Sequence, residues 1–150
     1  MKILAKNKRA FFDYEISEKL EAGMVLSGQE AKSAKTGGLT LHASFARINA
    51  RQAELLNAQI KPYAYASSLE NYDPAHTRKL LLHKSEIKKL AGRLQEKGLT
   101  LLPLEAYIKH GMIKILLGVG RSKKKIDKRE TIKRREDERR IARATRKSQT

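Results

Sequence analysis

The chain has 150 residues, which suits one domain with a terminal extension, and its 33 Lys and Arg against 16 Asp and Glu give a formal charge of +17. So large a positive charge points to nucleic acid as the partner, with an anionic membrane surface as the weaker option. The absence of Cys excludes disulfides and thiolate metal sites, and the absence of a secretory signal or of a roughly 18–20-residue apolar run leads us to expect a cytoplasmic protein.

The first ten residues are basic and mixed, and we interpret them as a short arm that leads to the first strand. Residues 13–26 carry enough alternation of apolar and polar positions to predict one long strand or two bent strands. Residues 27–38 are expected to form a short helix, because Ser27 and Glu30 have the spacing of a capping box.

Two strand-like runs follow at 39–48 and 53–60, and the short linker between them predicts a hairpin. Apolar residues of the first run share one parity, which is the pattern of a half-buried strand: Leu39, Leu41, Ala43 and Phe45. Residues 61–77 then form a long loop, and loops of that length in a small domain are usually functional or mobile.

The rest of the body predicts a strand over 78–84 and a helix over 86–97, with Ser85 as the helix cap and apolar residues spaced i, i+3, i+4 and i+7. A second hairpin is expected around residues 110–111. Pro103 lies inside its first strand, where it should mark an edge or a bulge because it cannot donate to a sheet ladder.

About six strands with two or three short helices fit a small, partly open antiparallel barrel covered by helices better than a layered parallel sheet. We therefore expect a mainly β fold. Residues 1–120 would form the barrel domain, and residues 121–150 would form a separate basic tail.

The tail carries 14 Lys and Arg against 5 Asp and Glu, with three isoleucines as its only large apolar residues. Three isoleucines cannot bury enough surface to offset the entropy of ordering thirty residues, so we expect a free tail to be disordered. Acid-before-base pairs at i,i+4 and the lack of Gly and Pro indicate a latent helix. The tail is predicted to be an RNA-binding arm, with a solvated charged segment that only aids solubility as the alternative.

Catalytic patterns are missing from the sequence. The four histidines are scattered, no glycine-rich loop sits between a strand and a helix, and no carboxylates are paired at a persuasive spacing, so we expect neither an enzyme nor a metal or cofactor site. Basic side chains spread over the body and the tail are candidates for phosphate contacts: Lys8, Arg9, Arg78, Lys79, Lys114, Lys123, Lys124 and Lys125. Phe12 is a candidate for stacking on a base. Composition alone thus indicates an RNA-binding module and does not name the RNA.

Several blocks in the right order resemble the transfer-messenger-RNA-binding protein family, also called small protein B or SsrA-binding protein. They are NKRAFFDYEI at 7–16, LEAG at 20–23, SGQEAKSAKTG at 27–37, YDPAHTRKLLLHKSEI at 72–87, GLTLLPLEAYIKHGMIK at 98–114 and KKKIDKRETIK at 123–133. The resemblance implies an oligonucleotide-binding-type barrel with no catalytic activity.

The resemblance also implies a function. Members of the family bind the tRNA-like part of transfer-messenger RNA and help bring the charged RNA, with elongation factor Tu, to stalled ribosomes for trans-translation, which rescues the ribosome and tags the nascent peptide. The tail is thought to enter the vacant message channel of the ribosome and to fold there as a helix. A monomer is the expected state.

Positions matching the family's RNA-binding face are Asn7, Lys8, Arg9, Glu21, Leu81 and Lys114, and positions matching its tail motif are Asp127, Lys128, Arg129, Ile132 and Lys133. Chemistry alone would make Glu21 a solvated strand residue and Leu81 a core residue, so both roles rest on the resemblance. Phe12 stands where the family commonly has His, which keeps a stacking surface and loses an imidazole hydrogen bond.

Two other functions stay open at this stage. A structural protein bound permanently to ribosomal RNA would have the same composition. An RNA-processing enzyme is a more distant alternative, because no residue set in the sequence supports catalysis.

Overall fold

The structure is a computed structural model that describes residues 1–65, 71–123 and 125–148, although the side chains of 125–131 and 144–148 lie outside the description. The longer strands are β2 (Tyr14–Met24), β4 (Phe45–Asn49), β5 (Gln52–Leu56), β7 (Arg78–Leu81), β8 (Leu99–Lys109) and β9 (Met112–Ser122). Three short strands are β1 (Lys2–Lys6), β3 (Leu39–Thr40) and β6 (Gln59–Ile60). The helices are α1 (Lys8–Asp13), α2 (Gly28–Lys35), α3 (Lys84–Arg93) and α4 (Lys125–Ser148).

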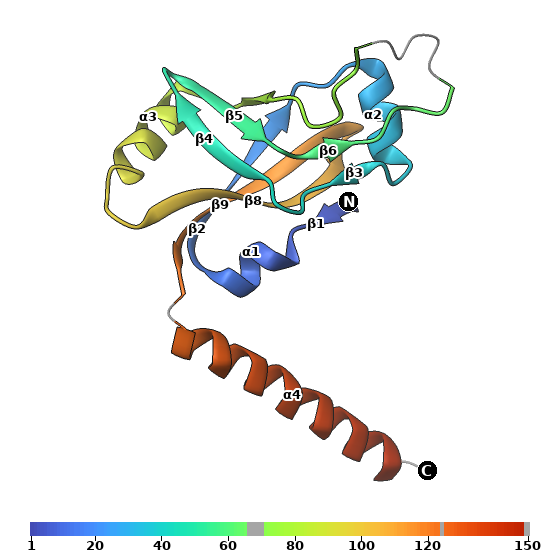
Figure 1. The fold of residues 1–150 in the computed structure, drawn as a ribbon, viewed down its shortest axis with the longest axis vertical. Coiled ribbons are helices and arrows are strands. Elements are labelled where there is room, and N and C mark those ends of the chain that lie inside the picture. Colours follow the sequence, from blue (N-terminus) through green and yellow to red (C-terminus); the bar gives the residue numbers. More distant parts are fainter. Residues whose placement is uncertain (66–70, 124, 149–150) are drawn as a thin grey trace.

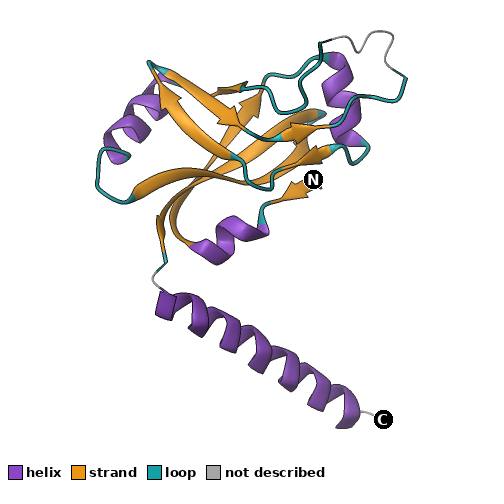
Figure 2. Cartoon of the chain, viewed as in Figure 1, coloured by secondary structure: helices purple, strands orange, loops and turns teal. Residues whose placement is uncertain are grey.

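The sheet closes on itself. Its strand order is β1-β8-β4-β5-β7-β2-β9, and β8 also pairs with β9, so six strands form a ring while β1 extends the edge at β8 (Figure 1). Strands β3 and β6 pair in a small second sheet. Helices α1, α2 and α3 lie at the periphery of the barrel and α4 leads away from it (Figure 2). The predicted mainly β barrel with peripheral helices is confirmed, with the ring closed rather than partly open.

Alternate side chains of the ring strands fill the interior. Strand β7 alternates between buried and exposed positions along its whole length, as a strand with one face on a core should. Leu55, Leu80, Leu101, Ile115 and Leu117 are among the fully buried side chains, and they come from four different strands. Each such burial contributes about 1.5–3 kcal/mol relative to an exposed side chain, so the core holds segments far apart in sequence together.

The N-terminus differs from the predicted arm, because its residues form β1 and α1. Asn7 begins α1, its Oδ1 accepting a hydrogen bond from the Ala10 N–H (3.3 Å) and its Nδ2 donating to the Pro103 carbonyl (2.9 Å). Ala10 packs in a small cluster with Leu102 and Leu104 of β8. The buried amide of Asn7 and the small apolar side chain of Ala10 therefore order this charge-rich N-terminal segment. The composition of the segment does not reveal these contacts.

The prediction of a single half-buried strand over 39–48 was wrong. Ala43 has a left-handed φ of 60°, and the chain turns there, with the Ser44 hydroxyl donating to the Leu41 carbonyl. Phe45 consequently emerges on the outside of the barrel, 42% exposed. The next run is also divided, because Asn57 has a φ of 62° and separates β5 from β6.

Both predicted hairpins are present. Residues Ala50 and Arg51 have φ values of 45° and 71°, and His110 and Gly111 have φ values of 51° and 74°. Two consecutive left-handed residues are the mark of type I′ turns, whose twist matches that of the paired strands. The ladder between β8 and β9 shifts register just after Pro103, which confirms the predicted bulge.

The capping box of α2 is confirmed, with Ser27 Oγ accepting from the Glu30 N–H and Glu30 Oε1 accepting from the Ser27 N–H, both at 3.1 Å. The cap of α3 was placed two residues too late. His83 is the N-cap, and its backbone N–H donates to Glu86 Oε1 (3.0 Å), whereas Ser85 lies inside the helix.

The tail begins slightly later than predicted. Strand β9 continues to Ser122, and the Lys123 N–H donates to the Asp13 carbonyl (2.9 Å), so a boundary at residue 120 falls inside the barrel sheet. The described side chains of α4, residues 132–143, are all exposed, and these include Ile132 and Ile141. Because this stretch of the helix buries no apolar face, packing contributes little to its stability, and disorder of the free tail stays a prediction.

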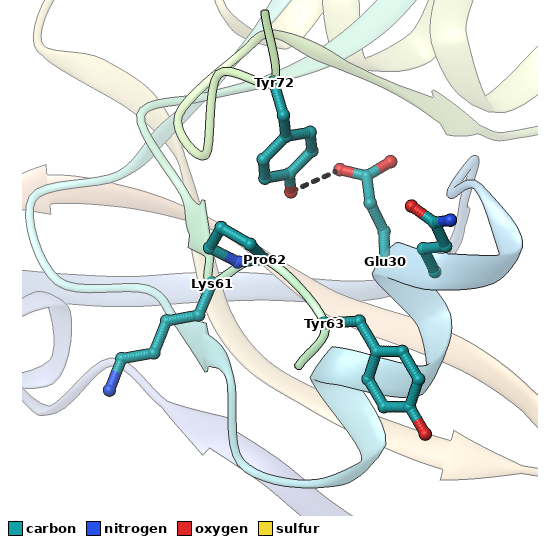
Figure 3. A pocket seen from close by; sticks show the side chains of 6 residues that line it. Glu30, Lys61, Pro62, Tyr63 and Tyr72 are labelled. Carbon is teal, nitrogen blue, oxygen red and sulfur yellow. Dashed lines mark hydrogen bonds between the residues drawn. The ribbon is translucent and has the colours of Figure 1, made fainter. Parts of the chain in front are cut away.

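A buried ion pair joins α2 to β7. Glu30 Oε2 accepts hydrogen bonds from Arg78 Nε (3.0 Å) and Nη2 (2.8 Å), and the Arg78 side chain is completely buried. The guanidinium also donates to the carbonyls of Ala58 (2.6 Å) and Pro74 (2.8 Å). Tyr72 reaches the same carboxylate through its hydroxyl, 3.2 Å from Glu30 Oε2 (Figure 3). The network thereby fixes the described end of the long loop against the barrel.

Burial alone would raise the pKa of Glu30, but hydrogen bonds from the Ser27 N–H, Arg78 and His76 outweigh it and lower the pKa to about 2. Because the pKa in the folded protein lies below the ordinary value of 4.5, the stability that this carboxylate contributes is present above pH 4.5. It is lost as the pH falls toward 2.

Replacing Arg78 by Met should destabilise the protein by about 3–5 kcal/mol at pH 7, because it leaves the Glu30 carboxylate buried without its cation. Urea unfolding monitored by circular dichroism measures this difference, and Lys79→Met on the exposed face of β7 is the matched control, with an expected change under about 0.5 kcal/mol. The difference between Arg78→Met and the native chain should shrink between pH 4.5 and 2, and a constant difference would contradict the assigned ion pair.

Candidate RNA-binding surface

A groove of about 440 Å³ at one end of the barrel brings together three of the predicted RNA-binding residues, Glu21, Leu81 and Lys114. The register of three neighbouring strands explains the grouping, because Gly23 of β2 lies opposite Lys114 of β9 on one side and opposite Leu81 of β7 on the other. The remaining lining residues come from β2 and β9, from α3 and from the link between β7 and α3: Gly23, Met24, Leu82, His83, Glu86 and Met112.

The floor of this groove is apolar and accessible. Leu81 of β7 is 50% exposed and Met112 of β9 is 56% exposed, and both line this groove. Gly23 allows the Leu81 side chain to lie close to β2, because an added Cβ would stand 3.3 Å from the Leu81 Cβ. An accessible Leu and an accessible Met in the lining of one groove offer a surface on which an unstacked base can pack.

Glu21 is a carboxylate held among cations. The Tyr107 hydroxyl donates a short hydrogen bond to Glu21 Oε2, and Lys109 Nζ lies 3.5 Å from the same oxygen. The Tyr107 hydrogen bond is the main reason that the pKa of Glu21 is lowered, so the carboxylate is ionised at neutral pH. Burial, followed by the hydrogen bond to Glu21, raises the pKa of Tyr107, which therefore stays a donor.

The arrangement leaves Glu21 able to accept a further hydrogen bond. No hydrogen bond to its Oε1 occurs within the part of the chain that the structure describes. An anchored carboxylate can accept from the N–H groups of a base, which loops of RNA expose when their bases are unpaired. Lys114 and Lys109 are placed to offset the repulsion between this carboxylate and RNA phosphates.

Lys8, Arg9, Phe12 and Lys123 do not join this groove. They lie on α1 and just after β9, at the far end of β2. Glu21 is seven positions along β2 from Tyr14, a distance of roughly 23 Å at about 3.3 Å per residue. The structure therefore places the candidate residues on two separate surfaces. We call the second one the α1 cluster, defined by Lys8, Arg9, Phe12 and Lys123.

Two basic residues of the α1 cluster already form contacts within the chain. Arg9 Nε forms an exposed ion pair with Asp13 Oδ2 (3.0 Å), and Lys123 Nζ donates to the Phe11 carbonyl (3.3 Å). The Phe12 ring is partly accessible and lies 6.0 Å from the guanidinium carbon of Arg135 in α4. The cluster therefore adjoins the first half of the tail helix rather than the groove.

Two predicted contact residues are buried. Asn7 is 5% exposed and its side chain holds α1 to β8, while Arg78 is enclosed by its ion pair with Glu30. Neither has a side-chain surface to offer to RNA, so we reassign both to the fold. Lys79 is exposed and, two residues before Leu81, shares its face of β7.

The tail candidates are only partly described. Lys124 lies outside the described residues, and of four further tail positions only the helical backbone is described: Lys125, Asp127, Lys128 and Arg129. Ile132 and Lys133 are exposed on α4. Within the described residues there is no group of three metal-ligating side chains, and no helix is long and apolar enough to span a membrane.

Sequence reasoning missed the residues that support Glu21. Tyr107 lies within a strand-like run and is buried, but its hydroxyl donates to Glu21. Its cross-strand partner Lys114 was already a candidate, so the hairpin register around residues 110–111 could have linked the two. Nothing in the local pattern singled out Lys109 or Met112.

Comparison with known proteins gives one consistent result. The family model described as SmpB protein matches residues 4–147. The SsrA-binding protein of Geobacillus sp. (strain WCH70) is 51% identical over 148 residues, covering 99% of this chain and 95% of that protein. The SsrA-binding protein of Latilactobacillus sakei subsp. sakei (strain 23K) is 48% identical over 145 residues, with coverage of 97% and 92%.

A solved structure is similar as well. A chain from "tmRNA-SmpB: a journey to the center of the bacterial ribosome" superposes with a TM-score of 0.67 at 45% identity, covering 83% of this chain and 87% of that chain.

Glu21→Gln should weaken binding of the transfer-messenger RNA expected from the sequence by roughly fivefold, because a charge-assisted hydrogen bond becomes a neutral one about 1 kcal/mol weaker. The amide keeps the shape of the side chain and can still accept from Tyr107. Filter binding or fluorescence anisotropy with RNA transcribed in vitro measures the change. If Glu21 were only a solvated charge, its neutralisation near phosphates would tighten binding instead.

Proposed function

Since the chain belongs to the SmpB protein family, we propose that it is an RNA-binding adaptor that binds the tRNA-like part of transfer-messenger RNA and brings it to stalled ribosomes for trans-translation. The observation that carries the proposal is the groove in which Glu21, Leu81 and Lys114 meet. Full-length similarity to two SsrA-binding proteins supports the choice of RNA.

Binding in the groove combines three kinds of contact. Lys114 attracts the phosphate backbone, and the accessible side chains of Leu81 and Met112 pack against an unstacked base. Glu21, held by Tyr107, accepts hydrogen bonds from base N–H groups. Such a site selects folded RNA with exposed loop nucleotides over a regular duplex, whose narrow major groove hides the base edges.

In this proposal, the opposite end of the barrel binds the ribosome. The α1 cluster and the tail form a second basic surface, separated from the groove by the length of β2. In this proposal the tail residues Lys125, Asp127, Lys128, Arg129, Ile132 and Lys133 contact the decoding region and the message channel. Ribosomal RNA supplies the anionic surface that stabilises α4 as a helix, and an adaptor with binding surfaces at both ends connects the two RNAs without catalysing a reaction.

The remaining partners follow from this role. Elongation factor Tu would meet the adaptor through the charged RNA rather than through a surface of its own. The adaptor would act as a monomer in the cytoplasm, where ribosomes translate.

The alternative is a structural protein bound permanently to ribosomal RNA, and crosslinking in cells separates the two. The tagged full-length chain, crosslinked and purified, should be enriched in one small stable RNA with a tRNA-like part and in stalled ribosomes, as sequencing of the bound RNA would reveal. Stoichiometric recovery with all ribosomes and no enrichment of that RNA would support the alternative.

Truncation after Lys123 should leave folding intact and RNA affinity within about threefold, yet abolish peptide tagging in a reconstituted translation assay. The cut is placed there because β9 continues to Ser122 and Lys123 still bonds to Asp13. As a matched pair, Ala142→Pro keeps every tail charge but costs about 3 kcal/mol of helix stability, whereas Ala142→Gln keeps the helix. Tagging that survives truncation would refute the role of the tail, and equal tagging by the pair would refute its helical form.

A further inference from the structure

A second groove, of about 500 Å³, lies between α3 and the β4–β5 hairpin. Its lining has an apolar part and a basic part. Ile48, Ile87 and Ala91 form the apolar part, and the basic part consists of Arg51, Lys84 and Lys88. None of these six residues belongs to the groove around Glu21 or to the α1 cluster.

The three cations of this second groove are not neutralised locally. Arg51, Lys84 and Lys88 are all exposed, and no described carboxylate lies within 4.0 Å of any of them. Arg47, on the adjacent strand, shows the contrast, because its guanidinium pairs with Glu54 at 2.9 Å. An unneutralised set of cations around a hollow is suited to an anionic occupant.

The spacing of the side chains defines a path. Lys84, Ile87, Lys88 and Ala91 follow the i, i+3, i+4, i+7 pattern, so they form one stripe along α3 with the two lysines one turn apart. Arg51 faces this stripe from the tip of the hairpin with a left-handed φ of 71°. A left-handed φ favours Asn or Gly, and any other residue there destabilises the turn by on the order of 1 kcal/mol. A functional requirement for a cationic side chain at this position would explain why it is an arginine.

The second groove lies beside the groove around Glu21. Helix α3 lines both, with Glu86 and the N-cap His83 on the side of Glu21 and the basic stripe on the other side. The strand register places both grooves at the same end of the barrel. Leu80 lies opposite both Met24 of β2 and Ala53 of β5, so the end of β7 adjoins the start of β5, next to Arg51.

The position of the second groove beside the groove around Glu21 decides between two anionic occupants, an acidic peptide and RNA. An acidic peptide would satisfy the charges, but it would have no reason to adjoin the groove around Glu21. An RNA bound at Glu21 needs to cross only the first turns of α3 to reach the second groove. There its phosphates would contact the cations, and an unpaired base would pack in the apolar part of the groove. Unpaired bases in RNA loops commonly pack against protein side chains in this way.

We propose that the groove between α3 and the β4–β5 hairpin is a second contact site for the same RNA, in which Arg51, Lys84 and Lys88 bind phosphates flanking an unpaired nucleotide. The base of that nucleotide packs against Ile48, Ile87 and Ala91. This inference rests on the proposed function, because the RNA held at Glu21 is the one that extends across α3.

The charge contacts are tested with the triple variant Arg51→Gln, Lys84→Gln, Lys88→Gln and full-length transfer-messenger RNA transcribed in vitro. Each lost phosphate contact should reduce the slope of log affinity against log salt by about 0.7–0.9, so the slope of the triple variant should fall by about 2.1–2.7. The matched control replaces three other exposed lysines that line neither groove: Lys35→Gln, Lys61→Gln and Lys97→Gln. Equal slopes for the two triple variants would overturn the proposal.

The apolar hollow is tested without changing charge. Ala91→Phe should fill it and weaken binding by about fivefold at an unchanged salt slope, since base packing is lost while the phosphate contacts stay. Urea unfolding shows whether the variant is folded. An unchanged affinity of the folded variant would overturn the placement of a base in the hollow.

Crosslinking identifies the occupant. The chain has no cysteine, so Asn49→Cys at the hairpin gives one attachment point for a photoactivated crosslinker beside Arg51. With stalled ribosomes and transfer-messenger RNA present, a crosslink to that RNA supports the proposal, while a crosslink to a protein or to ribosomal RNA alone overturns it.

Lys114→Gln separates failure of this inference from failure of the proposed function. If Lys114→Gln weakens binding and the triple variant does not, only the second groove is refuted. If the native chain does not bind transfer-messenger RNA at all, the proposed function fails first.

Discussion

Strand β9 pairs with β2 on one side and with β8 on the other, and this double pairing closes the barrel. The register of the β2–β9 ladder places Lys114 beside Gly23, whose other neighbour is Leu81. A slip of one residue would turn Lys114 into the core and Ile115 toward solvent, because side chains alternate along a strand. The register of β9 against β2 therefore determines both the closure of the barrel and the grouping of residues in the groove around Glu21.

The charge of +17 imposes the second constraint, since so many cations on a small body repel one another. Some are neutralised in place, most completely in the buried pair of Arg78 and Glu30. Among the described residues, Arg51, Lys84 and Lys88 have no carboxylate within 4.0 Å. In the proposed binding mode, RNA phosphates would offset the repulsion among such exposed cations.

A carboxylate inside such a surface requires an explanation. Glu21 remains ionised because Tyr107 donates a hydrogen bond to it and Lys109 lies nearby, both from β8. The same contacts hold the carboxylate still. In the proposed binding mode, a fixed acceptor surrounded by cations would discriminate between bases, whereas the cations alone would bind any polyanion. The specificity of the groove would then depend on a buried tyrosine that does not itself need to touch RNA.

The sequence by itself determined what neighbouring residues decide: the capping box of Ser27 and Glu30, the two hairpins and an irregularity at Pro103, together with the family resemblance. Local chemistry also indicated an RNA-binding chain. Only the tertiary structure decided which polar side chains hold the fold together. In the sequence, Asn7 and Arg78 resemble an ordinary surface amide and a surface cation, but contacts with β8 and α2 bury them. It also separated the α1 cluster from the groove. The physical reason is that burial and grouping depend on pairing between strands far apart in the chain, which no local pattern encodes.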